Sequence, residues 1–103
     1  MTDKYRRDGT PYPEGDKGLI EWGKDCEKRE YKIVAQETLA NGNFVSTVWL
    51  GIDHAFDGGK PLIFETMVFP KKGNWGELDC DRYSTEAEAL EGHKKMVEKW
   101  KNK

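Results

Sequence analysis

Residues 44–69, FVSTVWLGIDHAFDGGKPLIFETMVF, hold two apolar runs on either side of a polar loop with a glycine pair. The runs at 44–52 and 61–69 are dense in β-branched and aromatic residues, which fit a pleated, half-buried surface. The loop at 53–60 is too long for a tight hairpin and too short for a parallel crossover. The stretch therefore predicts two neighbouring, central strands of an antiparallel sheet.

The residues on either side of this stretch extend the predicted sheet. KIVAQETL at 32–39 predicts a first strand, and Asn41-Gly42 after it is a strong hairpin signal because both residues tolerate a positive φ. LDCDRY at 78–83 alternates well enough for a short fourth strand, and its acids suit a sheet edge. The order of these runs predicts a four-stranded antiparallel meander.

A helix is expected after the last strand. Thr85 followed three residues later by Glu88 is a capping signature, and the helical pattern continues to about Trp100. The expected apolar stripe of this helix consists of Ala89, Leu90, His93, Met96, Val97 and Trp100. We therefore expect the fold class α+β, with the meander packed by a C-terminal α-helix. The second face of the sheet would be covered by the N-terminal segment, by a second copy of the chain or by a partner.

The chain of 103 residues, 36% of them hydrophobic, suffices for one domain with a modest core. Residues 1–18 combine glycine and proline with charges of both signs, which predicts a flexible N-terminal arm. Residues 19–103 are then the single α+β domain. Its first residues, from Leu19 to Cys26, have helical spacing that Gly23 weakens, so we expect a short helix or turn there.

The composition disfavours several functional classes. The net charge of -2 provides no basic field, so direct binding of nucleic acid is not expected. No apolar run approaches the about 20 residues that span a bilayer, and the N-terminal residues lack the apolar centre of a signal peptide. We expect a cytoplasmic protein that contacts no membrane and binds no cofactor, with Cys26 and Cys80 as reduced, structural thiols.

The loop DHAFD at 53–57 is the tightest group of residues with potential chemistry. Asp53, His54 and Asp57 could ligate a divalent metal or supply a base, as in a small metal-dependent enzyme. A catalytic metal normally has more nitrogen or sulfur ligands, and the second histidine, His93, belongs to the predicted helix. The alternative is that Asp53 bonds backbone amides of the loop and His54 is a polar surface residue. We expect no metal site and no catalytic residue.

Aromatic and acidic residues outside the expected core suit contacts with another protein. The aromatic residues expected on this contact surface are Trp22, Trp49, Phe56 and Trp75. The acids concentrate between Glu77 and Glu91. They would attract a basic partner if they gathered on one face, and would otherwise be an ordinary solvated edge and helix start. The predicted partner-binding residues are Asp53, His54, Phe56, Trp75, Asp79 and Asp81.

Three motifs carry a resemblance to a protein family. STVWLGIDH, PLIFETMVF and RYSTEAEALEGH resemble a family of small, largely uncharacterised proteins encoded by bacteriophages and prophages. The resemblance spans Ser46 to His93, close to half the chain. In length and composition the chain also resembles phage-encoded anti-CRISPR proteins, several of which inhibit type II RNA-guided nucleases.

This resemblance implies a non-catalytic inhibitor that acts in the bacterial host cell by stoichiometric binding to a type II CRISPR effector nuclease or its guide-RNA complex. It assigns no functional residue. Such effectors hold nucleic acid in positively charged channels, which an acidic protein could occupy, although a net charge of -2 leaves blocking of a conformational change equally open. The alternatives are the metal-dependent enzyme and a phage structural or assembly protein. We expect a monomer or a weak homodimer.

Overall fold

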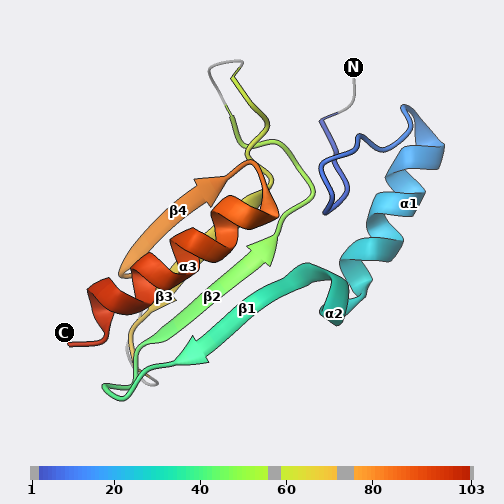
Figure 1. The fold of residues 1–103 in the computed structure, drawn as a ribbon. Helices are drawn as coiled ribbons and strands as arrows, with labels where there is room; N and C mark the ends of the chain where they lie inside the picture. The colour runs from blue at the N-terminus through green and yellow to red at the C-terminus, as the bar shows by residue number, and fades with distance from the viewer. Residues whose placement is uncertain (1–2, 56–58, 72–75, 103) are drawn as a thin grey trace.

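The computed structural model describes residues 3–55, 59–71 and 76–102. Along the chain these contain α1 (Asp16–Glu27), α2 (Arg29–Lys32), β1 (Ile33–Thr38), β2 (Phe44–Trp49), β3 (Phe64–Phe69), β4 (Asp79–Tyr83) and α3 (Glu86–Trp100). The strands form one antiparallel sheet in the order β1-β2-β3-β4, and α3 lies across one of its faces (Figure 1). The predicted α+β meander packed by a C-terminal helix is confirmed.

The turn between β1 and β2 forms where the hairpin signal predicts it. The amide of Leu39 donates to the carbonyl of Asn43 at 2.7 Å, and Gly42 has a φ of 91°. A side chain would be strained at this φ, and a Cβ there would also lie 2.6 Å from the Cβ of Lys71. The glycine therefore allows this turn to lie against the residues that follow β3.

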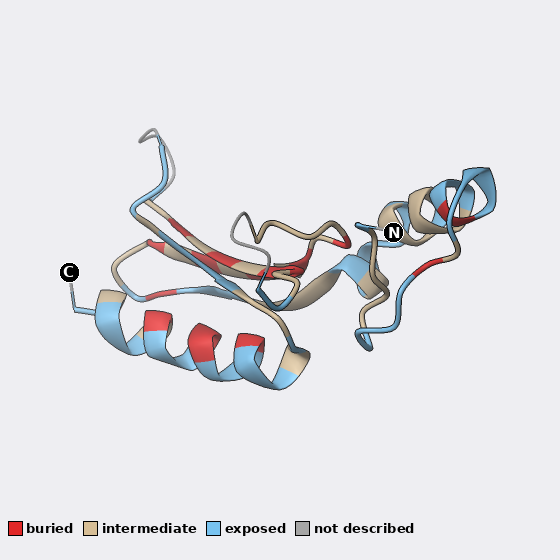
Figure 2. Cartoon of the chain, turned by 90° about the horizontal axis from the view of Figure 1, so that it is seen from above, coloured by how far each residue is buried: buried red, intermediate tan, exposed pale blue. Residues whose placement is uncertain are grey.

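One face of the two central strands is fully buried, and we call it the covered face. It consists of Val45, Thr47 and Trp49 of β2 and, opposite them on β3, Val68, Thr66 and Phe64. All six residues are 0% exposed, so the prediction that Trp49 lies on a contact surface is wrong: this ring belongs to the core. An apolar cluster around Trp49 and Phe64 occupies one end, and a second cluster around Val45, Val68 and Met96 occupies the other. Figure 2 shows the buried residues on these strands and on the side of α3 that faces them.

A row of polar side chains crosses the covered face between the two apolar clusters. The hydroxyl of Thr47 lies 2.6 Å from that of Thr66 and 2.7 Å from Nδ1 of His93, and Nε2 of His93 lies 3.1 Å from Oε1 of Glu37. Because an ionised carboxylate only accepts hydrogen bonds, Nε2 donates to Glu37, and a neutral ring then accepts from Thr47 at Nδ1. The row ties α3 to β1, β2 and β3 and gives the buried polar atoms of Thr47, Thr66 and His93 hydrogen-bond partners.

Helix α3 begins as the capping signature predicts. The hydroxyl of Thr85 accepts from the amide of Glu88 at 3.2 Å and donates to its carboxylate at 3.0 Å. The buried residues of α3 are Ala89, Gly92, His93 and Met96. A Cβ at Gly92 would lie 2.1 Å from Oη of Tyr83 on β4, so glycine is what allows α3 to pack so closely there.

The sequence prediction for Leu90 is wrong. It places Leu90 in the buried stripe, but this residue is 41% exposed. Successive residues differ by about 100° around a helix, and the close approach at Gly92 turns Ala89 and His93 toward the sheet. Leu90 is left on the flank of α3.

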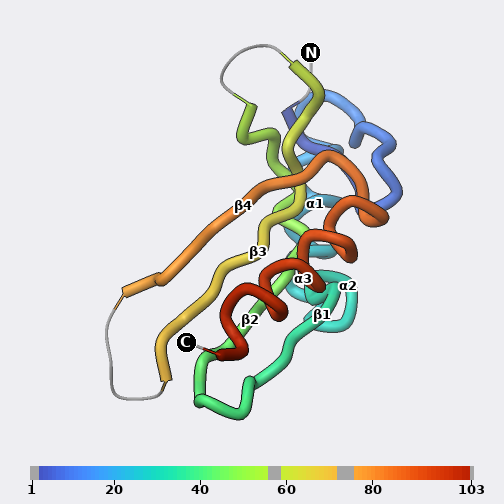
Figure 3. Tube along the Cα trace, turned by 60° about the vertical axis from the view of Figure 1, so that its left-hand side comes forward, coloured from blue at the N-terminus to red at the C-terminus, as the bar shows by residue number. Residues whose placement is uncertain are grey.

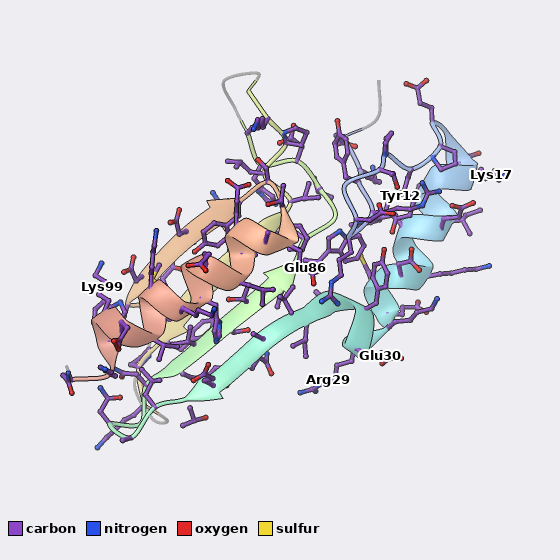
Figure 4. All side chains as sticks on the ribbon, viewed as in Figure 1. Tyr12, Lys17, Arg29, Glu30, Glu86 and Lys99 are labelled. Carbon is purple, nitrogen blue, oxygen red and sulfur yellow. The ribbon has the colours of Figure 1, made fainter. Side chains whose placement is uncertain are left out.

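The N-terminal segment packs against the end of the sheet that lies near the start of α3 (Figures 3 and 4). Tyr12 is 2% exposed, and its ring centroid lies 6.4 Å from that of Trp49. Nε of Arg7 donates to the carboxylate of Glu86 in the first turn of α3. Composition sets a domain boundary at residue 18, but α1 begins before it and Tyr12 belongs to the core. This segment therefore packs against the domain at Tyr12, which is buried, and at residues 4–7, which are half-buried, whereas residues 8–11 and 14–17 are exposed.

The opposite face of the central strands has no helix over it in the described chain, and we call it the open face (Figures 1 and 2). It consists of Phe44, Ser46 and Val48 of β2 with Phe69, Met67 and Glu65 of β3. These residues are half-buried rather than buried. Tyr12 contacts Trp49 on the covered face, so the N-terminal segment adds to the side that α3 already covers.

Candidate functional site

A groove of about 620 Å³ runs between β4 and α3, and we call it the acidic groove. Four carboxylates line it, those of Asp79, Asp81, Glu88 and Glu91, against two lysines, Lys95 and Lys99. Its floor contains the uncharged residues Tyr83, Ala87, Gly92 and Met96. A concave surface with an apolar floor and charged walls is typical of a binding site.

The acids of the groove come from two elements, and a different residue spacing places them on the same side in each element. On β4, Asp79 and Asp81 are two residues apart and pair with Val68 and Thr66 of the covered face, so both belong to the side of the sheet that carries α3. On α3, Glu88 and Glu91 are three residues apart and therefore neighbours on the helix surface. The acids that the sequence groups between residues 77 and 91 thus gather in large part on one face, which favours a role in binding over an ordinary solvated edge.

Asp79 closes the end of the groove that lies near the C-terminus of α3. Its Oδ2 accepts from Nζ of Lys99 at 2.7 Å and from Nε1 of Trp100 at 3.0 Å. These two donors hold the pKa of the Asp79 carboxyl below its usual value of 3.8. Figure 4 shows Lys99 in the last turn of α3. Asp79 therefore anchors the helix, and its charge is largely compensated.

The remaining carboxylates of the groove are less compensated. Oδ1 of Asp81 accepts from the amide of Arg82 at 2.9 Å, and the carboxylate of Glu88 accepts from Thr85. Glu91 faces Nζ of Lys94 at 3.9 Å, with both side chains mostly exposed. An ion pair of this length between exposed groups is weak, so it compensates the charge of Glu91 only slightly. The groove therefore keeps negative charge for a partner.

Cys80 lies between the two aspartates in sequence and adjoins the groove, but it pairs with Met67, so its side chain belongs to the open face. Desolvation by its neighbours first, and the Glu65 carboxylate second, raise the pKa of the Cys80 thiol to about 11. Among the charged neighbours, Glu65 on the adjacent strand has the largest effect on this pKa. A thiol with this pKa is a poor nucleophile at neutral pH.

The loop after β2 contains the other predicted site residues and lies apart from the acidic groove. Oδ1 of Asp53 accepts from the amides of Ala55 at 2.7 Å and Leu62 at 3.0 Å, so this carboxylate bonds the backbone of its own loop. The loop leaves the sheet where Phe64 pairs with Tyr83, whereas Asp79 lies toward the opposite end of β4. The structure therefore does not bring Asp53 and His54 together with the predicted acids of β4. Phe56, Asp57 and Trp75 lie outside the described residues.

The described part of the chain contains no group of three or more His, Cys, Asp or Glu side chains arranged to hold a metal ion. His93 is 4% exposed and bonds Thr47 and Glu37 within the core. The arrangement of the acidic groove is suited to binding through charge and shape.

The sequence prediction did not include several residues of the groove. Glu88, Glu91 and Lys95 of α3 line the groove and are not among the predicted partner-binding residues. The spacing of residues 88, 91 and 95 along one side of the predicted helix was the signal that could have identified them. Their position beside β4 depends on tertiary packing.

Comparison with known protein families, with curated proteins and with solved structures finds no match to this chain. Among the described residues, no helix is long and apolar enough to cross a membrane. The assignment of a partner therefore rests on the residues themselves and on the resemblance seen in the sequence.

Proposed function

We propose that this protein is a non-catalytic, stoichiometric inhibitor that binds a basic surface of another protein through the acidic groove. The observation that carries the proposal is the gathering of four carboxylates from β4 and α3 around one groove with an apolar floor. Charge steers the approach of a basic partner, and the apolar floor adds contact area once water is excluded.

The partner that we propose is a type II CRISPR effector nuclease or its guide-RNA complex, in the cytoplasm of a bacterial host. The resemblance of the chain to phage proteins and to anti-CRISPR proteins supports this choice. Such nucleases hold nucleic acid in positively charged channels, so they present the kind of surface that an acidic groove would bind. Asp81 and Glu91 are the groove residues to which we assign most of the attraction.

The metal-dependent enzyme is less well supported than an inhibitor. Asp53, the first of its three expected ligands, already accepts two backbone amides with one carboxylate oxygen. That geometry fixes the start of the loop and gives the carboxylate a structural role.

Cleavage of target DNA by a purified type II nuclease and its guide RNA tests the proposed function. The protein is titrated in before and after guide loading and before addition of target DNA. We expect loss of cleavage to be complete near one equivalent per nuclease, with the order of addition indicating which step is blocked. Unchanged cleavage across several nuclease orthologues would contradict the proposed partner.

A charge-reversal variant tests the role of the groove within the same assay. We expect Asp81→Lys combined with Glu91→Lys to weaken inhibition by at least about tenfold, because like charges across an interface cost several kcal/mol. Glu30→Lys, at an exposed position of α2, reverses one charge outside the groove and serves as the control. Equal inhibition by the groove variant and the control would mean that another surface binds the nuclease.

A further inference from the structure

The open face has a chemistry different from that of the acidic groove. Phe44 and Phe69 lie side by side at one end of it, with their ring centroids 6.5 Å apart. Met67 lies in the middle, and Val48 lies toward the other end. In the described chain no helix covers these apolar side chains (Figure 2). A contiguous apolar surface of this kind marks a contact site when something can pack against it.

Two oppositely charged side chains of this face, those of Glu65 and Arg82, form a compensated pair. Nε of Arg82 on β4 donates to Oε2 of Glu65 on β3 at 2.9 Å, and the side chains are 38% and 12% exposed respectively. The pair leaves this part of the face without net charge, so it offers little attraction to a strongly basic or strongly acidic surface. A second copy of the same face presents both a positive charge, on Arg82, and a negative charge, on Glu65. Under a two-fold rotation, Arg82 of each copy can approach Glu65 of the other.

We propose that the open face is a self-association surface on which a second copy of the chain docks, sheet against sheet, around a two-fold axis. Sheets pack face to face about 10 Å apart through their apolar side chains, and Phe44, Phe69, Met67 and Val48 supply such side chains. They surround Ser46, whose hydroxyl accepts a hydrogen bond from Nε2 of Gln36 at 3.0 Å. Each copy then contributes the same residues, with the Arg82 and Glu65 charges exchanged between copies.

The size of the face sets the strength of this association. Strands of about six residues are roughly 20 Å long, and four of them are roughly 15–20 Å wide, which gives about 300–400 Å² of projected area per copy. This is about half of the roughly 800 Å² that each partner buries in a standard interface. The dimer is therefore weak, with a dissociation constant in the micromolar to millimolar range. The acidic groove lies beside α3 on the covered side and stays accessible in it.

The first test uses the unmodified full chain. Sedimentation from about 5 µM to about 1 mM should show the mass rising toward that of a dimer, as a weak interface requires. Over the same range, the methyl NMR signal of Met67 on the open face should shift. The signal of Met96, which is 8% exposed on the buried side of α3, should stay constant and is the internal control.

A charge-exchange experiment then identifies the partner as a second copy. Arg82→Glu leaves two acids on the face and Glu65→Arg leaves two bases, so each variant alone should associate at least about tenfold more weakly. An equimolar mixture restores opposite charges across the interface and should associate within about threefold of the unmodified chain. Lys94→Glu, at a site on α3 with a 76% exposed side chain, is the matched control and should associate normally.

Several results would overturn the proposal. A constant monomer mass up to about 1 mM would exclude self-association of the strength that this area supports. A dimer in which Met67 does not shift would use a different surface. If the face instead took up another protein, Met67 would shift on addition of the nuclease and not with concentration. Failure of the mixture to restore association, with both variants folded by circular dichroism, would also contradict the exchanged charge pair. None of these results depends on whether the nuclease is inhibited.

Discussion

The covered face and the open face both consist of residues of β2 and β3, but the covered face is buried and the open face is only half-buried. Phe64 and Phe69, at the two ends of β3, illustrate the contrast: Phe64 is 0% exposed on the covered face, and Phe69 is half-buried on the open face. Both faces carry aromatic and β-branched residues. The difference arises from the element that packs on each face, because α3 and the N-terminal segment both add to the same side. The covered face holds the fold together, and the open face remains available for contacts.

The largest expected effect on stability is at Phe64, and it should clearly exceed the effect at Phe69. Phe64→Ala should lower the free energy of unfolding by about 3–5 kcal/mol, because a fully buried ring is replaced by a cavity. Phe69→Ala should lower it by no more than about 1–2 kcal/mol, since solvent already reaches this ring. Urea denaturation at low micromolar concentration, where the monomer dominates, measures both values. Equal losses of unfolding free energy in the two variants would mean that the covered and open faces contribute equally to stability.

The polar row on the covered face gives the next largest effect. Thr47→Val keeps the shape of the side chain but leaves Nδ1 of His93 and the hydroxyl of Thr66 without this partner, which should cost about 1–3 kcal/mol. Thr38→Val, at an exposed position of β1, is the control and should change stability by less than about 0.5 kcal/mol. If both variants unfolded at the same urea concentration, the row would contribute nothing to the covered face.

Stability should depend on pH through Asp79, which anchors the end of α3. Its pKa is lowered in the folded state by Lys99 and Trp100, so its ion pair stabilises the fold above the unfolded value of about 3.8. This contribution is lost as the pH falls through the lower, folded pKa. Asp79→Asn should therefore lower stability at pH 7 by no more than about 1 kcal/mol, and the difference from the unmodified chain should disappear near pH 2.

Thermal unfolding at the two pH values measures this dependence. Asp81→Asn is the control, because the structure gives Asp81 a backbone amide as partner and no cation among the described contacts. A destabilisation by Asp79→Asn that persisted undiminished near pH 2 would mean that its cause is not the charge of Asp79.

The smallest expected effect is at Leu90. This residue is 41% exposed, so Leu90→Ala should lower the free energy of unfolding by less than about 1 kcal/mol, and the higher helix propensity of alanine offsets part of the loss. A residue in the core would lose about 2–5 kcal/mol. A loss of that size in urea denaturation would show that α3 packs with Leu90 toward the sheet, as the sequence pattern predicts.

Much of the fold could be predicted from local signals. The hairpin at Asn41-Gly42 and the cap at Thr85 depend on residues close in sequence, and both form as predicted. The alternation along β2 and β3 identified the two faces but could not tell which one would be covered. The rotation of α3 about its own axis is not predictable from the sequence pattern, because the contact between Gly92 and Tyr83 depends on how α3 packs against β4.

The candidate site was less predictable than the fold. Asp79 and Asp81 were identified as contact residues, and both line the groove. Their neighbours Glu88 and Glu91 come from α3, and their position beside β4 depends on how the helix lies on the sheet. The packing of Tyr12 was missed for a related reason. Its segment is polar and rich in glycine and proline, and composition does not reveal that one aromatic ring is enclosed by Trp49 and its neighbours.

The measurement that most directly tests the contrast between the faces compares two valines in the same sample. Val48 lies half-buried on the open face, and Val68 is 0% exposed on the covered face. With methyl-labelled valine at low micromolar concentration, a neutral paramagnetic agent in the solvent should broaden the Val48 signals strongly and leave those of Val68 nearly unchanged. Equal protection of both valines would contradict the account, because it would mean that the open face is already covered within the single chain.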